Sequence, residues 1–146
     1  MENPPRLITR MLAESSSRPE SQRVVIAVER RVFLKRRWRA QAPDGSDFGF
    51  DLEHRLVDGC VVYQTEDFDY VVEQLPEIVY NIPFENPAHA AEVAWKVGNL
   101  HLPAEIFEDR ILVLHDEAMT QLLARENWQF SEPAVLFRPL KAMAHT

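Results

Sequence analysis

The stretch VGNLHLPAEIFEDRILVLHDE, residues 97–117, predicts much of the fold of the second half of the chain. It opens where a helix should end, because Gly98 suits the left-handed position that follows a helix. Two short apolar segments come next, separated by the acidic pair at 108–109, and each is typical of a strand. Asp116 then suits the N-cap position of another helix. One helix end, two strands and one helix start are therefore expected within 21 residues.

The alternation of strands and helices continues on both sides of this stretch. Asn86 and Pro87 are typical of a helix start, with asparagine at the N-cap and proline at the first helical position. The expected elements are a strand at 77–84, a helix at 88–97, strands at 105–107 and 110–115, a helix from 117 to about 127 and a strand at 135–138. This order is typical of a ferredoxin-like βαββαβ domain. We expect that domain at residues 76–139, followed by a flexible tail at 140–146.

The first half of the chain has a different pattern. Segments rich in β-forming residues follow one another closely between turn signals such as Pro43-Asp44-Gly45. Strands are expected at 6–12, within 24–42, and at 48–52, 61–63 and 68–72, with a polar loop or disordered connection at 13–22. These features predict a small all-β domain at residues 1–75. We expect this domain, through the basic segment described below, to bind a peptide or protein partner. The expected fold class is therefore α+β.

Composition excludes several classes of protein. The net charge is −7, which argues against general attraction to nucleic acid or acidic membranes. Cys60 is the single cysteine, so neither an internal disulfide nor a thiolate cluster for metal is available. We find no apolar run of about 18 residues, and no glycine-rich phosphate loop, GxSxG or HExxH motif. We expect a cytoplasmic protein that is not an enzyme.

Six basic residues lie between positions 30 and 39. One interpretation is a docking patch for an acidic partner, with Arg36, Arg37 and Arg39 as binding residues. The other is a solvated strand whose charges prevent edge-to-edge pairing. Trp38 is the one aromatic residue next to these arginines. A single ring is too little for a base-stacking platform.

His101 comes just after the expected helix end, where its side chain can face outward. Nickel and similar divalent ions bind neutral imidazole well. If His101 lies near the two-fold axis of a dimer, two copies supply two imidazoles to one ion. The alternative is a polar residue that interacts favourably with the negative end of the helix dipole.

The motif GNLHLP at 98–103, followed by a strand that ends in HDE at 115–117, resembles the UreE family of urease accessory proteins. Asn99, His101 and Pro103 match the family motif, whereas Leu100 stands where the family usually has arginine. Looser similarity runs over most of the chain from about residue 24. The resemblance implies a homodimer built from a β domain and a ferredoxin-like domain. It also implies that His101 is the interfacial nickel ligand, and that the partners are urease apoprotein and its accessory GTPase.

The resemblance implies secondary metal ligands as well. His115 lies in a region that often forms a peripheral site in the family, and Glu117 stands where a second histidine is often found. His145 in the tail can supply a further imidazole. His115 as a structural residue at a strand end, and His145 as a surface residue, remain the alternatives.

The expected function is a metallochaperone that delivers Ni²⁺ to urease apoprotein, with Zn²⁺ or Cu²⁺ as ions that such a site can bind in vitro. A metal-free adaptor of the same fold, with a vestigial metal site, is the main alternative. A small-molecule or RNA binder is a third, and the acidic composition argues against RNA.

Overall fold

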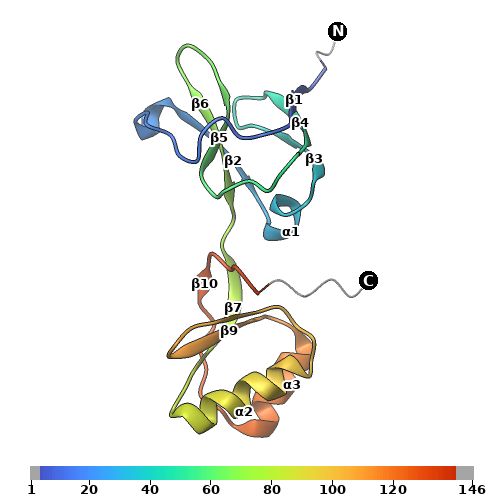
Figure 1. Cartoon of the computed structure of the whole chain (residues 1–146), viewed down its shortest axis with the longest axis vertical. Helices are drawn as coiled ribbons and strands as arrows, with labels where there is room; N and C mark the ends of the chain where they lie inside the picture. Colours follow the sequence, from blue (N-terminus) through green and yellow to red (C-terminus); the bar gives the residue numbers. More distant parts are fainter. Residues whose placement is uncertain (1–3, 141–146) are drawn as a thin grey trace. The chain divides into compact units, whose positions relative to one another are not determined.

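The computed structural model describes residues 4–140, and the chain divides into two compact units, Met1–Leu75 and Pro76–Thr146. Both units combine sheets with helical segments, so the chain is a mixed α+β protein (Figure 1). Each unit has its own cluster of buried apolar side chains. Between residues 4 and 140, no helix is long and apolar enough to cross a membrane.

The first unit contains two three-stranded sheets, with strand orders β1-β4-β3 and β2-β6-β5. Their elements are β1 (Arg6–Ile8), the 3₁₀ helix η1 (Glu20–Gln22), β2 (Arg23–Val28), α1 (Arg30–Phe33), β3 (Arg37–Gln41), β4 (Asp47–Asp51), β5 (Cys60–Gln64) and β6 (Asp69–Gln74). The β1–β4 and β2–β6 pairs are parallel, and the other two are antiparallel. The opening strand ends at Ile8, earlier than the predicted residue 12.

Helix α1 lies inside the basic segment, where the sequence predicted β-structure. One turn of helix buries Phe33 and packs Val32 against the core, while Arg31 stays exposed. Val32 and Phe33 prefer strands, but they form a helical turn here because that turn buries both side chains. The described part of the unit is therefore mainly β, with α1 and the 3₁₀ helix η1 in addition, and the prediction of an all-β unit was wrong on this point.

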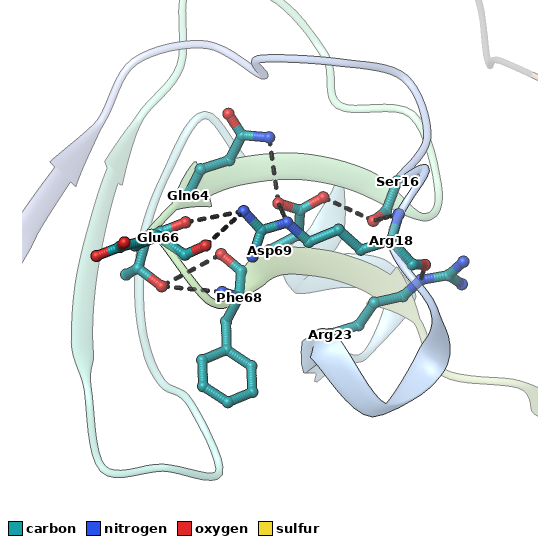
Figure 2. A network of polar contacts seen from close by, with 8 residues as sticks. Ser16, Arg18, Arg23, Gln64, Glu66, Phe68 and Asp69 are labelled. Atoms are coloured by element: carbon teal, nitrogen blue, oxygen red, sulfur yellow. Dashed lines mark hydrogen bonds and ion pairs between the residues drawn. The ribbon is translucent and has the colours of Figure 1, made fainter.

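Residues 13–22, which end in η1, form an ordered polar connection, because Ser16 and Arg18 contact a buried carboxylate (Figure 2). The side chain of Asp69 on β6 is only 3% exposed. Its oxygens accept hydrogen bonds from Ser16 Oγ at 2.6 Å and from Gln64 Nε2 at 3.1 Å, and one lies 3.3 Å from Arg18 Nε. A buried charge needs such partners, so the polar residues of the loop anchor it to the sheet.

The second unit has one antiparallel sheet with strand order β10-β7-β9-β8. Its elements are β7 (Glu77–Pro83), α2 (Pro87–Gly98), β8 (Ala104–Ile106), β9 (Arg110–Leu114), α3 (Glu117–Glu126) and β10 (Ala134–Val135). Both helices begin at the predicted caps. The Asn86 side chain accepts a hydrogen bond from the His89 amide at 2.8 Å, and Asp116 accepts one from the Ala118 amide at 2.9 Å.

Helices α2 and α3 cover the same face of this sheet (Figure 1). Their buried residues share one core with alternate residues of β7 and β9: Tyr80, Ile82, Val93, Val97, Ile111, Val113, Met119, Leu122 and Leu123. The Lys96 ammonium on α2 lies 2.7 Å from a carboxylate oxygen of Glu126 on α3. Hydrogen bonds to Glu126 and then to Glu92 raise the pKa of Lys96 above its ordinary value.

The chain after β10 covers the other face of the sheet. Phe137 is fully buried against Val79 and Leu112 there. Further along, the Leu140 amide donates a hydrogen bond to the carbonyl oxygen of Ala104, the first residue of β8, at 2.7 Å. Burial of Phe137 favours this path over continued pairing with β7, so the last strand has two residues and not the four predicted at 135–138.

Candidate metal site

His101 lies on the turn that joins α2 to β8, and its backbone is left-handed, with φ of 57°. Gly98 was predicted to hold this conformation, but it is the last residue of α2 and its φ is not positive. The helix is instead continued by a tighter turn, in which the amides of Leu100 and His101 bond the carbonyls of Val97 and Gly98 at 3.0 and 3.1 Å. The left-handed residue therefore comes three positions later than predicted.

The flanking leucines determine where the His101 side chain points. Leu100 and Leu102 are both partly buried against the core of the second unit, whereas His101 is exposed. Leu100, which replaces the usual arginine of the resemblance, is thus a core contact in this chain. Two anchored neighbours and a tight turn present the imidazole to solvent on a well-supported loop.

By itself His101 would supply one ligand and not a complete metal site. Among residues 4–140, no group of three or more histidine, cysteine, aspartate or glutamate side chains could hold a metal ion. A single imidazole binds divalent metal weakly, and neutral nitrogen is the form that binds. A useful site at His101 therefore needs ligands from outside the described part of one chain.

His115 is engaged in a different contact from the predicted one. Its Nε2 lies 2.8 Å from a carboxylate oxygen of Glu132, and its ring stacks on Tyr80 at 4.4 Å between centroids. Glu117, the predicted neighbouring ligand, is the first residue of α3. A carboxylate there interacts favourably with the positive end of the helix dipole. Sequence reasoning missed Glu132 because 17 residues separate it from His115, and no spacing rule connects them.

Two further sets of predicted residues lie elsewhere. His145 lies outside the described residues, the last of which is Leu140. Arg36, Arg37 and Arg39 lie in the first unit, at β3 or just before it, and all three are exposed. The structure thus places His101, His115 and Glu117 in the second unit and the predicted partner-binding arginines in the first.

Comparison with known proteins identifies the family. Residues 77–146 match the family model described as UreE urease accessory protein, C-terminal domain. A urease accessory protein UreE of Mesorhizobium japonicum is 33% identical over 143 residues, covering 94% of this chain and 70% of the relative. The chain belongs to the UreE family. The identity extends over both units, so the first unit also resembles its counterpart in that relative.

Other members of the UreE family match a smaller part of the chain. The relative from Chelativorans sp. is 37% identical over 91 residues, which is 61% of this chain and 58% of the relative. The relative from Rhizobium meliloti is 33% identical over 90 residues, again 58% of its length. The matches thus span a little over half the length of these two relatives, which are accessory proteins rather than enzymes by name.

Proposed function

We propose that this chain binds Ni²⁺ and delivers it to urease apoprotein while the urease metallocentre is assembled. The observation that carries the proposal is His101, an exposed imidazole on a well-supported turn in a member of the UreE family. Imidazole is a good ligand for nickel. A shallow site with few protein ligands leaves coordination positions open, which suits a carrier that must release its metal.

A homodimer would complete the site. In a two-fold dimer each surface patch meets its own copy, so one histidine can supply two imidazoles. The exposed surface of α2 supports such contact, since the Trp95 side chain is 68% exposed. Trp95 also lies close to the His101 turn, because its backbone carbonyl accepts a hydrogen bond from the amide of Asn99, two residues before His101. Tryptophan is enriched at the centres of protein–protein interfaces. The strand order β10-β7-β9-β8 supports our inference that this unit is a ferredoxin-like domain.

The remaining parts of the proposal concern weaker ligands and partners. His115, Glu117 and His145 are proposed as secondary ligands, and Glu132 is added because its carboxylate already contacts His115. The proposed partners are urease apoprotein and the urease accessory GTPase, in the cytoplasm, with the basic segment of the first unit as a docking surface. The proposal contains no catalytic step.

A metal-free adaptor is the second candidate, and one observation favours it. The part of the chain from residue 4 to residue 140 holds no ready-made group of three metal ligands. In that case the family fold would bind polypeptides, and His101 would be a surface residue without a metal.

The test is a calorimetric Ni²⁺ titration of the untagged full chain, with its mass measured by light scattering. We expect one tightly bound ion per dimer and loss of that ion in His101→Gly, which keeps the left-handed backbone while removing the imidazole. His54→Ala serves as the control, because it removes another exposed histidine. Absence of tight binding by wild type would favour the adaptor, and equal binding in wild type and His101→Gly would overturn the role of His101.

A further inference from the structure

Strand β3 lies at the end of its sheet and pairs on one side only, with β4 (Figure 1). The hydrogen bonds just beyond its ends show which backbone groups face β4. The Ala42 amide donates to the Ser46 carbonyl at 2.8 Å, and the Leu52 amide donates to the Arg36 carbonyl at 3.0 Å. In an antiparallel pair the bonded residues alternate, so the even-numbered residues of β3 direct their amide and carbonyl groups toward β4.

The odd-numbered residues of β3 therefore direct their backbone groups away from the sheet. These residues are Arg37, Arg39 and Gln41, and within the described chain no strand pairs with them on that side. Their side chains are exposed, whereas Trp38 is buried and Ala40 half-buried on the inner face. The free edge thus offers unpaired amides and carbonyls directly beside two arginine side chains.

The surface around this edge has an excess of positive charge. Arg36 and Arg37 share one carboxylate, since the Nε of each lies 3.3 Å from Asp51 Oδ1. Three more cations, Arg31, Lys35 and Arg39, are exposed and form no ion pair with any residue in the 4–140 range. Arg39 also lies opposite Gly49 on β4, so no side chain of its cross-strand neighbour screens it.

We propose that the free edge of β3 binds an extended acidic segment of a partner protein by strand addition. The partner's backbone would pair with the outward groups of Arg37, Arg39 and Gln41. Carboxylates at alternate positions of that segment would then lie beside the arginine side chains, as cross-strand neighbours on one face do. This proposal specifies the partner chemistry for the docking role proposed above, and it does not depend on nickel binding.

Two other occupants fit the edge less well. Nucleic acid lacks a backbone that can pair with a strand, and the tryptophan beside the arginines is buried and stacked on Phe50, with 3.8 Å between centroids. A second copy of β3 would bring arginine against arginine, which is unfavourable. The observations therefore favour an acidic polypeptide.

The test measures fluorescence anisotropy of a labelled eight-residue peptide of alternating threonine and glutamate, titrated with the full chain at low salt. We expect saturable binding that weakens about tenfold or more in the Arg37→Glu/Arg39→Glu double variant, because two charge-assisted contacts become repulsive. The matched control is Arg31→Glu/Lys35→Glu, which changes the charge equally but lies outside β3. Arg39→Glu alone avoids disturbing the contact with Asp51, and thermal unfolding checks that each variant is folded.

A second peptide, N-methylated at its glutamates, loses the amides that would face Arg37 and Arg39 in an antiparallel pair but keeps every carboxylate. Strand addition requires that it bind at least about tenfold more weakly than the first peptide. Equal losses in both double variants, or no effect of methylation, would show non-specific charge attraction and overturn the proposal. Absence of saturable binding up to about 1 mM, or tighter binding of single-stranded RNA through the same arginines, would overturn it too.

Discussion

His101 and Asn127 are the two non-glycine residues between positions 4 and 140 that adopt a left-handed backbone, each with φ of 57°. Asn127 does so where α3 ends, a common place for this conformation. His101 does so between two leucines that pack against the core. The conformation is unfavourable for residues with a Cβ atom, and it persists where the surrounding packing supports it. The packing of the leucines therefore orients the candidate ligand.

The left-handed conformation of His101 predicts that a glycine variant at this position is more stable than an alanine variant. His101→Gly should be more stable than His101→Ala by about 1 kcal/mol, because glycine adopts positive φ without the steric cost that alanine bears. The measurement is the free energy of unfolding from urea denaturation. Asn127→Gly and Asn127→Ala should differ in the same direction, since that position has the same φ and no proposed role in metal binding. Equal stability of His101→Gly and His101→Ala would contradict a left-handed His101 in solution.

At the level of elements, an ion pair between the half-buried Arg18 and the buried Asp69 helps to hold the loop before β2. Arg18 contacts Asp69 and also donates hydrogen bonds to the carbonyls of Thr65 and Glu66, at 3.1 and 3.0 Å (Figure 2). One side chain thus joins the loop to the turn between β5 and β6. A buried pair adds little net stability over an apolar pair, but removal of one partner leaves a buried charge with fewer contacts.

Removal of that arginine should loosen the whole loop. We expect Arg18→Met to lower the free energy of unfolding by about 2 kcal/mol, because Asp69 would keep its bonds to Ser16 and Gln64 but lose its counter-charge. Limited proteolysis should then cut within residues 13–22 sooner than in wild type. Arg10→Met, which removes an exposed arginine, should change stability by less than about 0.5 kcal/mol. An unchanged cleavage rate in Arg18→Met would show that the ion pair does not fix the loop.

At the level of the whole molecule, charge is distributed unequally between the units. Residues 1–75 contain 11 basic and 13 acidic residues, a net charge of −2, whereas residues 76–146 contain 5 and 10, a net charge of −5. The unit that carries His101 is therefore the more acidic one, and a negative field raises the local concentration of divalent cations. The basic segment gives the first unit a surface of opposite sign.

Separate cores predict separate unfolding transitions. Ile26→Ala should lower the thermal unfolding midpoint of the first unit, and Leu122→Ala should lower that of the second. Each substitution removes a side chain that is buried in only one core. A loss of about 2 kcal/mol or more corresponds to a shift of about 10 °C for units of this size. Differential scanning calorimetry of the full chain measures both transitions. If each substitution shifted one common transition, the units would unfold as a single cooperative structure.

Short-range interactions explain why several elements could be predicted from the sequence. Asn86 and Asp116 cap their helices with bonds to amides two or three residues away. The exposed position of His101 after a helix belongs to the same class, because a helix end and a nearby proline are visible in the sequence.

The sequence by itself determined the helix caps, the order of the elements in the second unit and the residue types available at the candidate site. Tertiary structure alone decided that His101, not Gly98, is left-handed, that Glu132 meets His115, and that a polar loop is fixed by Asp69. It also decided that a predicted strand segment became α1. The physical reason is that these outcomes depend on burial and on partners far away in the chain, and local preference yields wherever such contacts stabilise another conformation.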